Sequence, residues 1–415
     1  MTARLAVLVL LLTGGFAAAQ TTHTFSGQQR TRARYLFQTT DLSHTPADRA
    51  ALWAVRQQLV NLPALADARF KIIHQDKDTT VRWTLEESRT RFPLLDFGGL
   101  SDNLNVLIGY KDVNWRGLGH ELTAYYQNND GRHNFLLAFR NPGPGGSRWG
   151  YGAELRRYAS VEPLYFPQGG VNYDYTNLSF GGQVDYRLGY LHRVGVGLAL
   201  FRENYGKLPG QESLPGPQGL RENKALLKLF HDIDRRDFLP ARIGGFQHTT
   251  NVQSVLTRGR AGAFFSLWHD WRYFRLVGNS GNFAARLRAG VATNDAGPFA
   301  PFVLDSQVNI RGSGNRVDRG TAQLVLNLEY RHIFYRNERR RFALQAVAFS
   351  DAGTWRNPGG QVGDLVAEEN FRHFVGGGLR YVSTKTASVV LRLDYGVEVR
   401  GQQGRGITFG FGHYF

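Results

Sequence analysis

Apolar and polar side chains alternate with a period of two residues from about residue 92 to the end of the chain. The alternation fills segments of roughly ten residues that are separated by Gly, Pro, Asn and Asp. In residues 322–331 the apolar positions share one face and the polar positions share the other: Leu324, Leu326, Leu328 and Tyr330 against Gln323, Asn327, Glu329 and Arg331. The pattern indicates strands with one apolar and one charged face.

Such strands fit either a soluble sandwich, whose apolar face forms the core, or a membrane barrel, whose apolar face meets lipid. Residues 1–19 favour the membrane, because Arg4, an apolar run from Leu5 to Leu12 and the small residues Ala17, Ala18 and Ala19 form a secretory signal peptide. Cleavage is expected before Gln20. The chain has no run of roughly 18 to 20 apolar residues, so a transmembrane helix is not expected.

Composition supports the same conclusion. The chain has 49 glycines, 13% aromatic residues and negative mean hydropathy, which suits a barrel in which every second residue meets lipid. Its net charge of +16 would suggest nucleic acid in a cytosolic protein, but an exported chain meets lipid head groups and lipopolysaccharide instead. The alternative is that the arginines line a solvated surface or pore. About fifteen strands are recognisable, and an even number is the rule, so 16 are expected.

Residues 20–90 have a different period and predict a small soluble α+β module. The stretch SHTPADRAALWAVRQQLVNL is an amphipathic helix, with Thr45 as the expected N-cap. A short strand and a first helix precede it, and two alternating segments around Phe70 and Val81 follow as a hairpin. The expected order is strand, helix, helix, strand, strand. The remainder, 91–415, is the predicted transmembrane antiparallel β-barrel, so the chain is mainly β.

Several motifs occur in an order that resembles the BamA/TamA family of outer-membrane assembly factors and its relatives, the two-partner secretion transporters. Residues 20–90 resemble a periplasmic POTRA module, and GYKDVNWRGLGHEL (109–122) resembles the opening barrel strands. NIRGSGN (309–315) resembles the arginine-glycine signature of the sixth extracellular loop, although Ser313 stands where the family has an aromatic. NLEYR (327–331) and FSDAG (349–353) resemble the strands that follow.

The resemblance implies that the long loop before residue 321 folds into the barrel lumen, where its arginine meets acidic side chains of the wall. Alternation places Glu329 inside, and Phe349 and Asp351 on one face. The predicted latch therefore comprises Arg311, Gly312, Glu329, Phe349, Asp351 and Gly353. The alternative is that these charges are ordinary solvated residues of the lumen. A phosphate-binding loop is disfavoured, because a strand and not a helix follows.

The resemblance further implies assembly or insertion of outer-membrane proteins, or their translocation, through a weak seam between the first and last barrel strands. These are expected near Leu104 to Lys111 and at Gly406 to Phe415, with Leu104, Tyr110, Phe411 and Phe415 at the seam. The α+β module would lie in the periplasm and bind unfolded clients, and accessory lipoproteins are possible partners. The competing interpretation is a dedicated secretion channel or passive pore in the same membrane.

Enzyme chemistry is not expected. The chain has no cysteine, no Gly-x-Ser-x-Gly and no His-Glu-x-x-His, and its 12 histidines lack metal-ligand spacing. The densest polar cluster, His231, Asp232 and Asp234, is explained by the end of a strand. No cofactor, metal or nucleic acid is implied.

Overall fold

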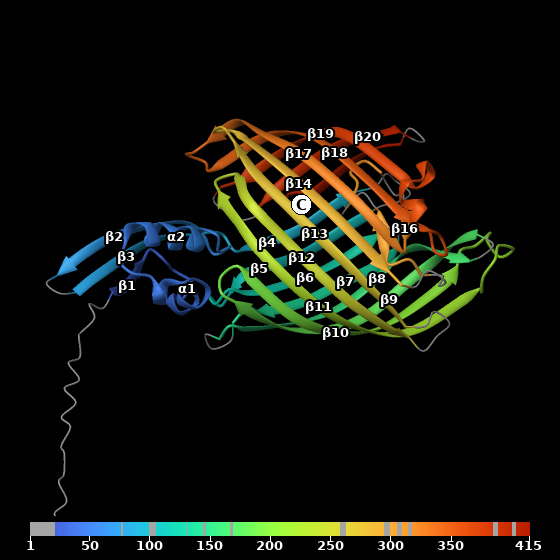
Figure 1. The fold of residues 1–415 in the computed structure, drawn as a ribbon, viewed down its shortest axis with the longest axis horizontal. Helices are drawn as coiled ribbons and strands as arrows, with labels where there is room; N and C mark the ends of the chain where they lie inside the picture. Colours follow the sequence, from blue (N-terminus) through green and yellow to red (C-terminus); the bar gives the residue numbers. More distant parts are fainter. Residues whose placement is uncertain are drawn as a thin grey trace, which may run out of the picture.

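The computed structural model describes residues 21–75, 78–98, 105–129, 131–143, 147–166, 169–257, 263–293, 299–304, 309–313, 318–384, 389–400 and 404–415. Figure 1 shows a small α+β domain beside one end of a large barrel. We call that end of the barrel the near end and the opposite one the far end. The expected signal peptide and Leu104 lie outside the described residues.

The α+β domain has the predicted order of elements: β1 Thr21–Ser26, α1 Ala33–Thr39, a 3-10 turn Leu42–His44, α2 Arg49–Val60, β2 Leu65–Gln75 and β3 Asp78–Glu87. Its sheet has the order β1-β3-β2, with β1 parallel and β2 antiparallel to β3. Leu52, Val55 and Leu59 of α2 are buried against Trp83, as the helical spacing predicts. The helix begins later than expected, since Asp48 and not Thr45 is its N-cap and accepts a hydrogen bond from the Ala51 amide.

The barrel is one antiparallel sheet of 16 strands, which confirms the predicted fold. Neighbours in the sheet are also neighbours in the chain, except that β14 pairs with β17 across a long loop that contains β15 Phe302–Leu304 and β16 Asp318–Gly320. The wall strands are β4 Arg91–Gly98, β5 Asn105–Trp115, β6 His120–Asn129, β7 Arg132–Asn141, β8 Trp149–Phe166, β9 Gly169–Leu188, β10 His192–Lys207, β11 Gly219–Leu239, β12 Arg242–Thr257, β13 Phe264–Val277, β14 Gly281–Ala292, β17 Ala322–Asn337, β18 Phe342–Arg356, β19 Phe371–Ser383, β20 Val390–Arg400 and β21 Arg405–Phe411. Two 3-10 turns, Val362–Val366 and Glu368–Asn370, join β18 to β19.

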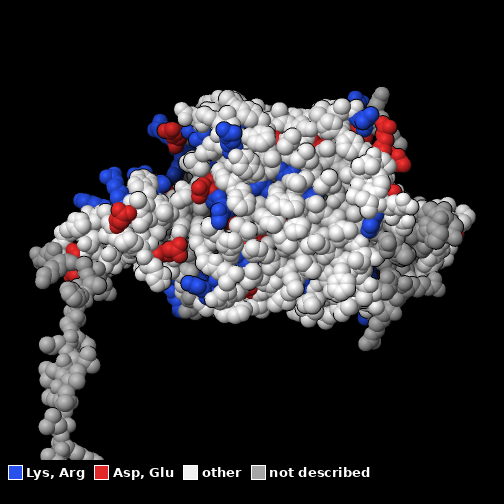
Figure 2. Space-filling model, in the orientation of Figure 1, with Lys and Arg blue, Asp and Glu red and all other residues white. Residues whose placement is uncertain are grey.

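Side chains alternate across the wall as the sequence indicates. On β17, Leu324 and Leu326 are 44% and 42% exposed on the outside, whereas Glu329 and Arg331 are 1% and 0% exposed on the inside. Figure 2 shows the result on one face, where most of the outer wall is uncharged, although some Lys and Arg atoms are visible in its middle part as well as at its ends and on the α+β domain. None of the described helices is long and apolar enough to span a bilayer.

The sheet begins one strand earlier than expected. Its first strand is β4, and the segment near Leu104 to Lys111 belongs to the second strand, β5. Tyr110 is therefore paired on both sides, with Pro93 of β4 and Ala124 of β6, and does not lie at the seam. The two end strands, β4 and β21, lie close together, but no hydrogen-bonded register joins them within the described residues.

Candidate functional site: a latched loop in the barrel lumen

The loop between β14 and β17 enters the lumen instead of leaving the barrel. Leu304 and Ile310 of this loop are buried against Val325, Trp355 and Phe374, which face inward from the wall. The short strands β15 and β16 pair with each other and so give the loop its own hydrogen bonds. Residues 309–311 at its tip are almost fully buried. The described part of the loop is thus folded back into the barrel.

Arg311 lies at the centre of the loop contact and is fully buried. Its Nε and Nη2 donate to the two carboxylate oxygens of Asp351 at 2.8 and 2.9 Å, and its backbone amide donates to Oδ2 at 3.0 Å. Its Nη1 donates to Glu329. The guanidinium also lies 3.8 Å from the centre of the Phe349 ring. This two-point carboxylate contact with an aromatic face suits arginine and not lysine.

Glu329 is shared by several arginines of the inner wall. Arg331 donates to its other oxygen at 2.5 Å, and Arg380 approaches to 3.7 Å while pairing with Asp394 at 2.7 and 3.0 Å. All of these side chains are at most 1% exposed. The loop arginine therefore joins a connected ion network rather than a single pair, which distinguishes it from a set of solvated lumen charges.

A row of glycines lets the loop approach the wall. Successive cross-strand partners run from Phe349 through Gly376 and Gly396 to Gly406, across β18, β19, β20 and β21. Gly312, with φ +89°, lies on this row: a Cβ there would be 2.8 Å from Gly396 Cα, and one on Gly406 would be 2.8 Å from the Gly312 carbonyl oxygen. The loop backbone thus rests directly on the last two strands.

The other predicted latch residue, Gly353, makes a second close approach. A Cβ at Gly353 would be 2.5 Å from Leu304 and 2.8 Å from Ile310, so the loop packs against the wall at this point also. The structure therefore brings together Arg311, Gly312, Glu329, Phe349, Asp351 and Gly353.

The C-terminus departs from the expectation. The alternation of residues 407–415 predicts a strand that runs to Phe415, but β21 ends at Phe411 and Gly412, with φ +82°, turns the chain inward. Phe411 stays on the outer face, whereas Phe415 is buried with Ile243, Phe274 and Ala284 of β12, β13 and β14. Figure 1 shows the chain ending within the outline of the barrel. Of the two predicted seam residues in this segment, only Phe411 belongs to the end strand.

The inward tail also contacts the latch. The Tyr414 ring lies 4.5 Å from the guanidinium of Arg311 and 4.8 Å from that of Arg392. Arg311 thus contacts two aromatic rings, those of Phe349 and Tyr414. The loop itself has Ser313, whose hydroxyl donates to the Ile310 carbonyl, where the resemblance expects an aromatic. Tyr414 supplies an aromatic contact from elsewhere in the chain.

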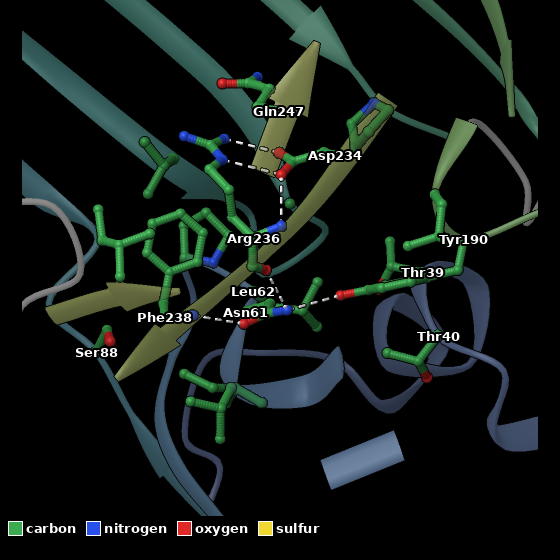
Figure 3. A pocket seen from close by; sticks show the side chains of 18 of the residues that line it. Thr39, Thr40, Asn61, Leu62, Ser88, Tyr190, Asp234, Arg236, Phe238 and Gln247 are labelled. Carbon is green, nitrogen blue, oxygen red and sulfur yellow. Dashed lines mark hydrogen bonds and ion pairs between the residues drawn. The ribbon is translucent and has the colours of Figure 1, made fainter. Parts of the chain in front are cut away.

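A cavity of about 1280 Å³ opens at the near end, between the α+β domain and the barrel rim. Eight arginines and four carboxylates line it, together with the C-terminal residues 413–415. Figure 3 shows how its wall is joined: Asn61 of the α+β domain donates to the Arg236 carbonyl at 3.0 Å and accepts from the Phe238 amide at 3.0 Å. Burial here raises the pKa of Tyr190 to about 12, so its hydroxyl stays protonated beside Asn61.

The cluster His231, Asp232 and Asp234 does not form a catalytic or metal site. Asp232 pairs with Arg193, Asp234 pairs with Arg236, and His231 points to the opposite face of β11. No group of three or more potential metal ligands comes together among the described residues.

No protein-family description and no curated protein matches the sequence. Solved structures do match: BamA from Haemophilus ducreyi lacking POTRA domains 1–3 (12% identity, 94% of this chain and 82% of that chain, TM-score 0.52), CdiB from Acinetobacter baumannii (14%, 95% and 74%, 0.56) and CdiB from Escherichia coli (11%, 94% and 75%, 0.63). The predicted resemblance is thus confirmed for the fold, and the chain has the fold of the BamA and CdiB barrels.

Proposed function

We propose that this protein spans the bacterial outer membrane and assists the insertion of other proteins into that membrane, or their passage across it. The apolar outer wall and the fold shared with BamA and CdiB support the location and the general activity. The α+β domain, in this proposal, is a POTRA-like module on the periplasmic side. Its sheet has two open edges, β1 and β2, to which an extended client can add a strand.

The observation that carries the proposal is the seam between β4 and β21. As far as the chain is described, these are the shortest wall strands, with 8 and 7 residues against 10 to 21 in the others, and no ladder joins them there. Pro93 of β4 lacks an amide N–H, a residue tolerated only at the edge of a sheet. The seam therefore presents backbone donors and acceptors that can pair with a strand of a client protein.

The latch contacts the strands next to the seam from inside the lumen, and it can therefore influence seam opening. The loop backbone at Gly312 rests on Gly396 of β20 and Gly406 of β21, and Arg311 fixes that loop to β17 and β18. The last two strands are thus held against the wall through the loop. Movement of the loop changes how firmly β21 is positioned.

A disulfide across the seam tests the proposal. Because the sequence has no cysteine, the introduced pair cannot form a disulfide with any other residue of the chain. Cysteines replace Leu94 of β4 and, in turn, each residue of β21, and the pair that oxidises in the folded protein is selected. The control links Leu393 with Phe409, which are partners within the existing β20–β21 ladder. We expect seam closure to abolish function reversibly, with recovery on reduction, and the control to retain it. Full activity with the seam closed would refute a lateral route.

The second candidate is a dedicated secretion channel, which the arginine-lined cavity at the barrel mouth favours because it provides an entrance to the lumen. Depletion of the protein followed by quantitative proteomics distinguishes the two. A general loss of outer-membrane barrels supports assembly, and loss of one secreted protein supports dedicated secretion. An unchanged outer membrane and secretome would refute both.

A further inference from the structure

Four histidines form one patch on four adjacent strands of the barrel: His192 on β10, His231 on β11, His248 on β12 and His269 on β13. His192 and His231 approach to 3.2 Å between ring nitrogens, and so do His248 and His269. The Thr250 hydroxyl lies 3.0 Å from His269 and 3.3 Å from His248. The patch plays no part in the lumen latch.

The patch faces outward, where apolar side chains would be expected. The sequence neighbours of the histidines lie on the inner face, namely Phe230, Asp232 and Asp270. Asp270 is paired there with Arg286. On the outer face, the patch borders Leu229, 52% exposed, and Trp271, 37% exposed. The Trp271 ring stacks on both His248 and His269, at 5.0 and 4.9 Å between centres. Trp271 therefore fixes the orientation of that histidine pair.

The position of the patch along the strands is also informative. Towards the far end lie exposed apolar residues, including Leu227, Val252 and Leu267. Towards the near end, the same outer face continues through Tyr273, 50% exposed, to Arg275 on β13 and to Arg235 on β11, with the exposed Asp237 beyond Arg235. The histidines thus lie with the exposed aromatic residues Trp271 and Tyr273 between an apolar belt and a charged rim, the level at which a barrel wall passes from hydrocarbon to head groups.

The chemistry of the patch favours an acceptor outside the protein. A neutral imidazole has one N–H and one acceptor nitrogen, so a pair joined by one N–H···N bond retains a second N–H that points elsewhere. Such donors are costly in hydrocarbon without a partner. Lipid phosphate supplies acceptor oxygens at this depth, and the arginines below add positive charge.

We propose that His192, His231, His248 and His269 form a binding site on the outer wall for the phosphate of a phospholipid head group in the near-end leaflet. The lipid's acyl chains would lie on the apolar belt, and Arg235 and Arg275 would face the head group. The site would hold the lipid on β10–β13, a part of the wall that β14 separates from the latch strands β17–β21.

The test uses the full, folded protein in detergent, mixed with phosphatidylglycerol or with diacylglycerol of the same acyl chains, and native mass spectrometry to count retained lipids. Leucine replaces all four histidines, and a milder double variant, His231→Leu with His269→Leu, covers the case in which the first does not fold. His133→Leu is the matched control, since His133 is exposed near the far end. Heat-modifiable migration verifies folding.

We expect wild type to retain phosphatidylglycerol over diacylglycerol, the histidine variants to lose about tenfold in apparent affinity, and His133→Leu to behave as wild type. Equal retention in wild type and both histidine variants would overturn the proposal, as would equal retention of the two lipids by wild type. Loss of wild-type retention on adding EDTA would also overturn it, because the histidines would then hold a metal ion.

Discussion

Replacement of Arg311 by alanine is the most direct probe of the lumen latch. Arg311 makes three of its hydrogen bonds to Asp351 and one to Glu329, all fully buried. Glu329 keeps Arg331 after the change, but Asp351 has no other cationic partner among the described residues. Removing one member of a buried pair leaves an uncompensated charge, which costs about 3–5 kcal/mol.

The measurement is urea unfolding of the full protein in phospholipid vesicles, followed by tryptophan fluorescence and heat-modifiable migration. Arg311→Ala is expected to lower the free energy of unfolding by about 3–5 kcal/mol. Adding Asp351→Asn removes the stranded charge and should restore about 1–2 kcal/mol. Arg400→Ala is the control, because Arg400 is 69% exposed at a 3.4 Å pair with Glu368 and should change stability by less than about 1 kcal/mol.

Two results would refute this reasoning. Arg311→Ala within about 1 kcal/mol of wild type would mean that the lumen hydrates Asp351, so the buried network contributes little. A double variant that is no more stable than Arg311→Ala would mean that the stranded Asp351 charge is not what destabilises the single variant.

Three further predictions concern backbone, tail and pH. Gly210→Ala should lower the free energy of unfolding by about 1–2 kcal/mol, and Gly312→Ala should lower it by more. Both glycines have positive φ (+83° and +89°), but of the two only Gly312 touches neighbouring backbone. Equal effects of the two changes in urea unfolding would show that this backbone contact does not contribute to the latch. Deleting residues 413–415 should lower the free energy of unfolding by about 3–5 kcal/mol, because two buried aromatic side chains are lost. It should also raise ion conductance in planar bilayers, because the tail narrows the lumen. Unchanged conductance would show that the tail does not narrow the lumen. Burial opposes ionisation of Glu87, but hydrogen bonds from Thr31 and from the Arg30 amide outweigh burial and lower the pKa of its carboxyl. The contribution of Glu87 to the stability of the α+β domain is therefore present at neutral pH and is lost as pH falls through that lowered pKa. The variant Glu87→Gln should be more sensitive to protease than wild type at neutral pH but not in acid, and a difference that stays constant with pH would contradict this linkage.

Alternation in the sequence was sufficient to predict which wall residues face the lumen. A period of two leaves no freedom once one face is apolar, so Glu329 and Asp351 had to lie inside. Alternation could not predict the partners that complete the buried ion network around Glu329, such as Arg380. It specifies the face on which a residue lies and not which residues lie next to it on other strands. Those neighbours depend on register, which is set by turns and bulges such as the one near His373.

The two errors at the seam also have physical causes. The segment RFPLLDFG contains Pro93, which argues against a central strand, and it is an edge strand that tolerates it. At the other end, Phe411 and Phe415 have the same parity, so alternation alone continues the strand through both. The chain turns inward because Gly412 adopts a positive φ, and glycine permits this turn without requiring it.

The last strand is held by its ladder with β20 and by contacts inside the barrel. Within the described sheet β21 has one hydrogen-bonded neighbour, β20, so it lacks a second ladder whose bonds would each contribute about 0.5–1.5 kcal/mol. In place of that ladder, Gly406 supports the lumen loop and the tail carries Phe415 to a cluster on β12, β13 and β14. Within the described residues, opening the seam therefore breaks no ladder between β4 and β21, and contacts in the lumen contribute to its free-energy cost. A mutation in the latch or tail should then alter seam opening without touching either edge strand.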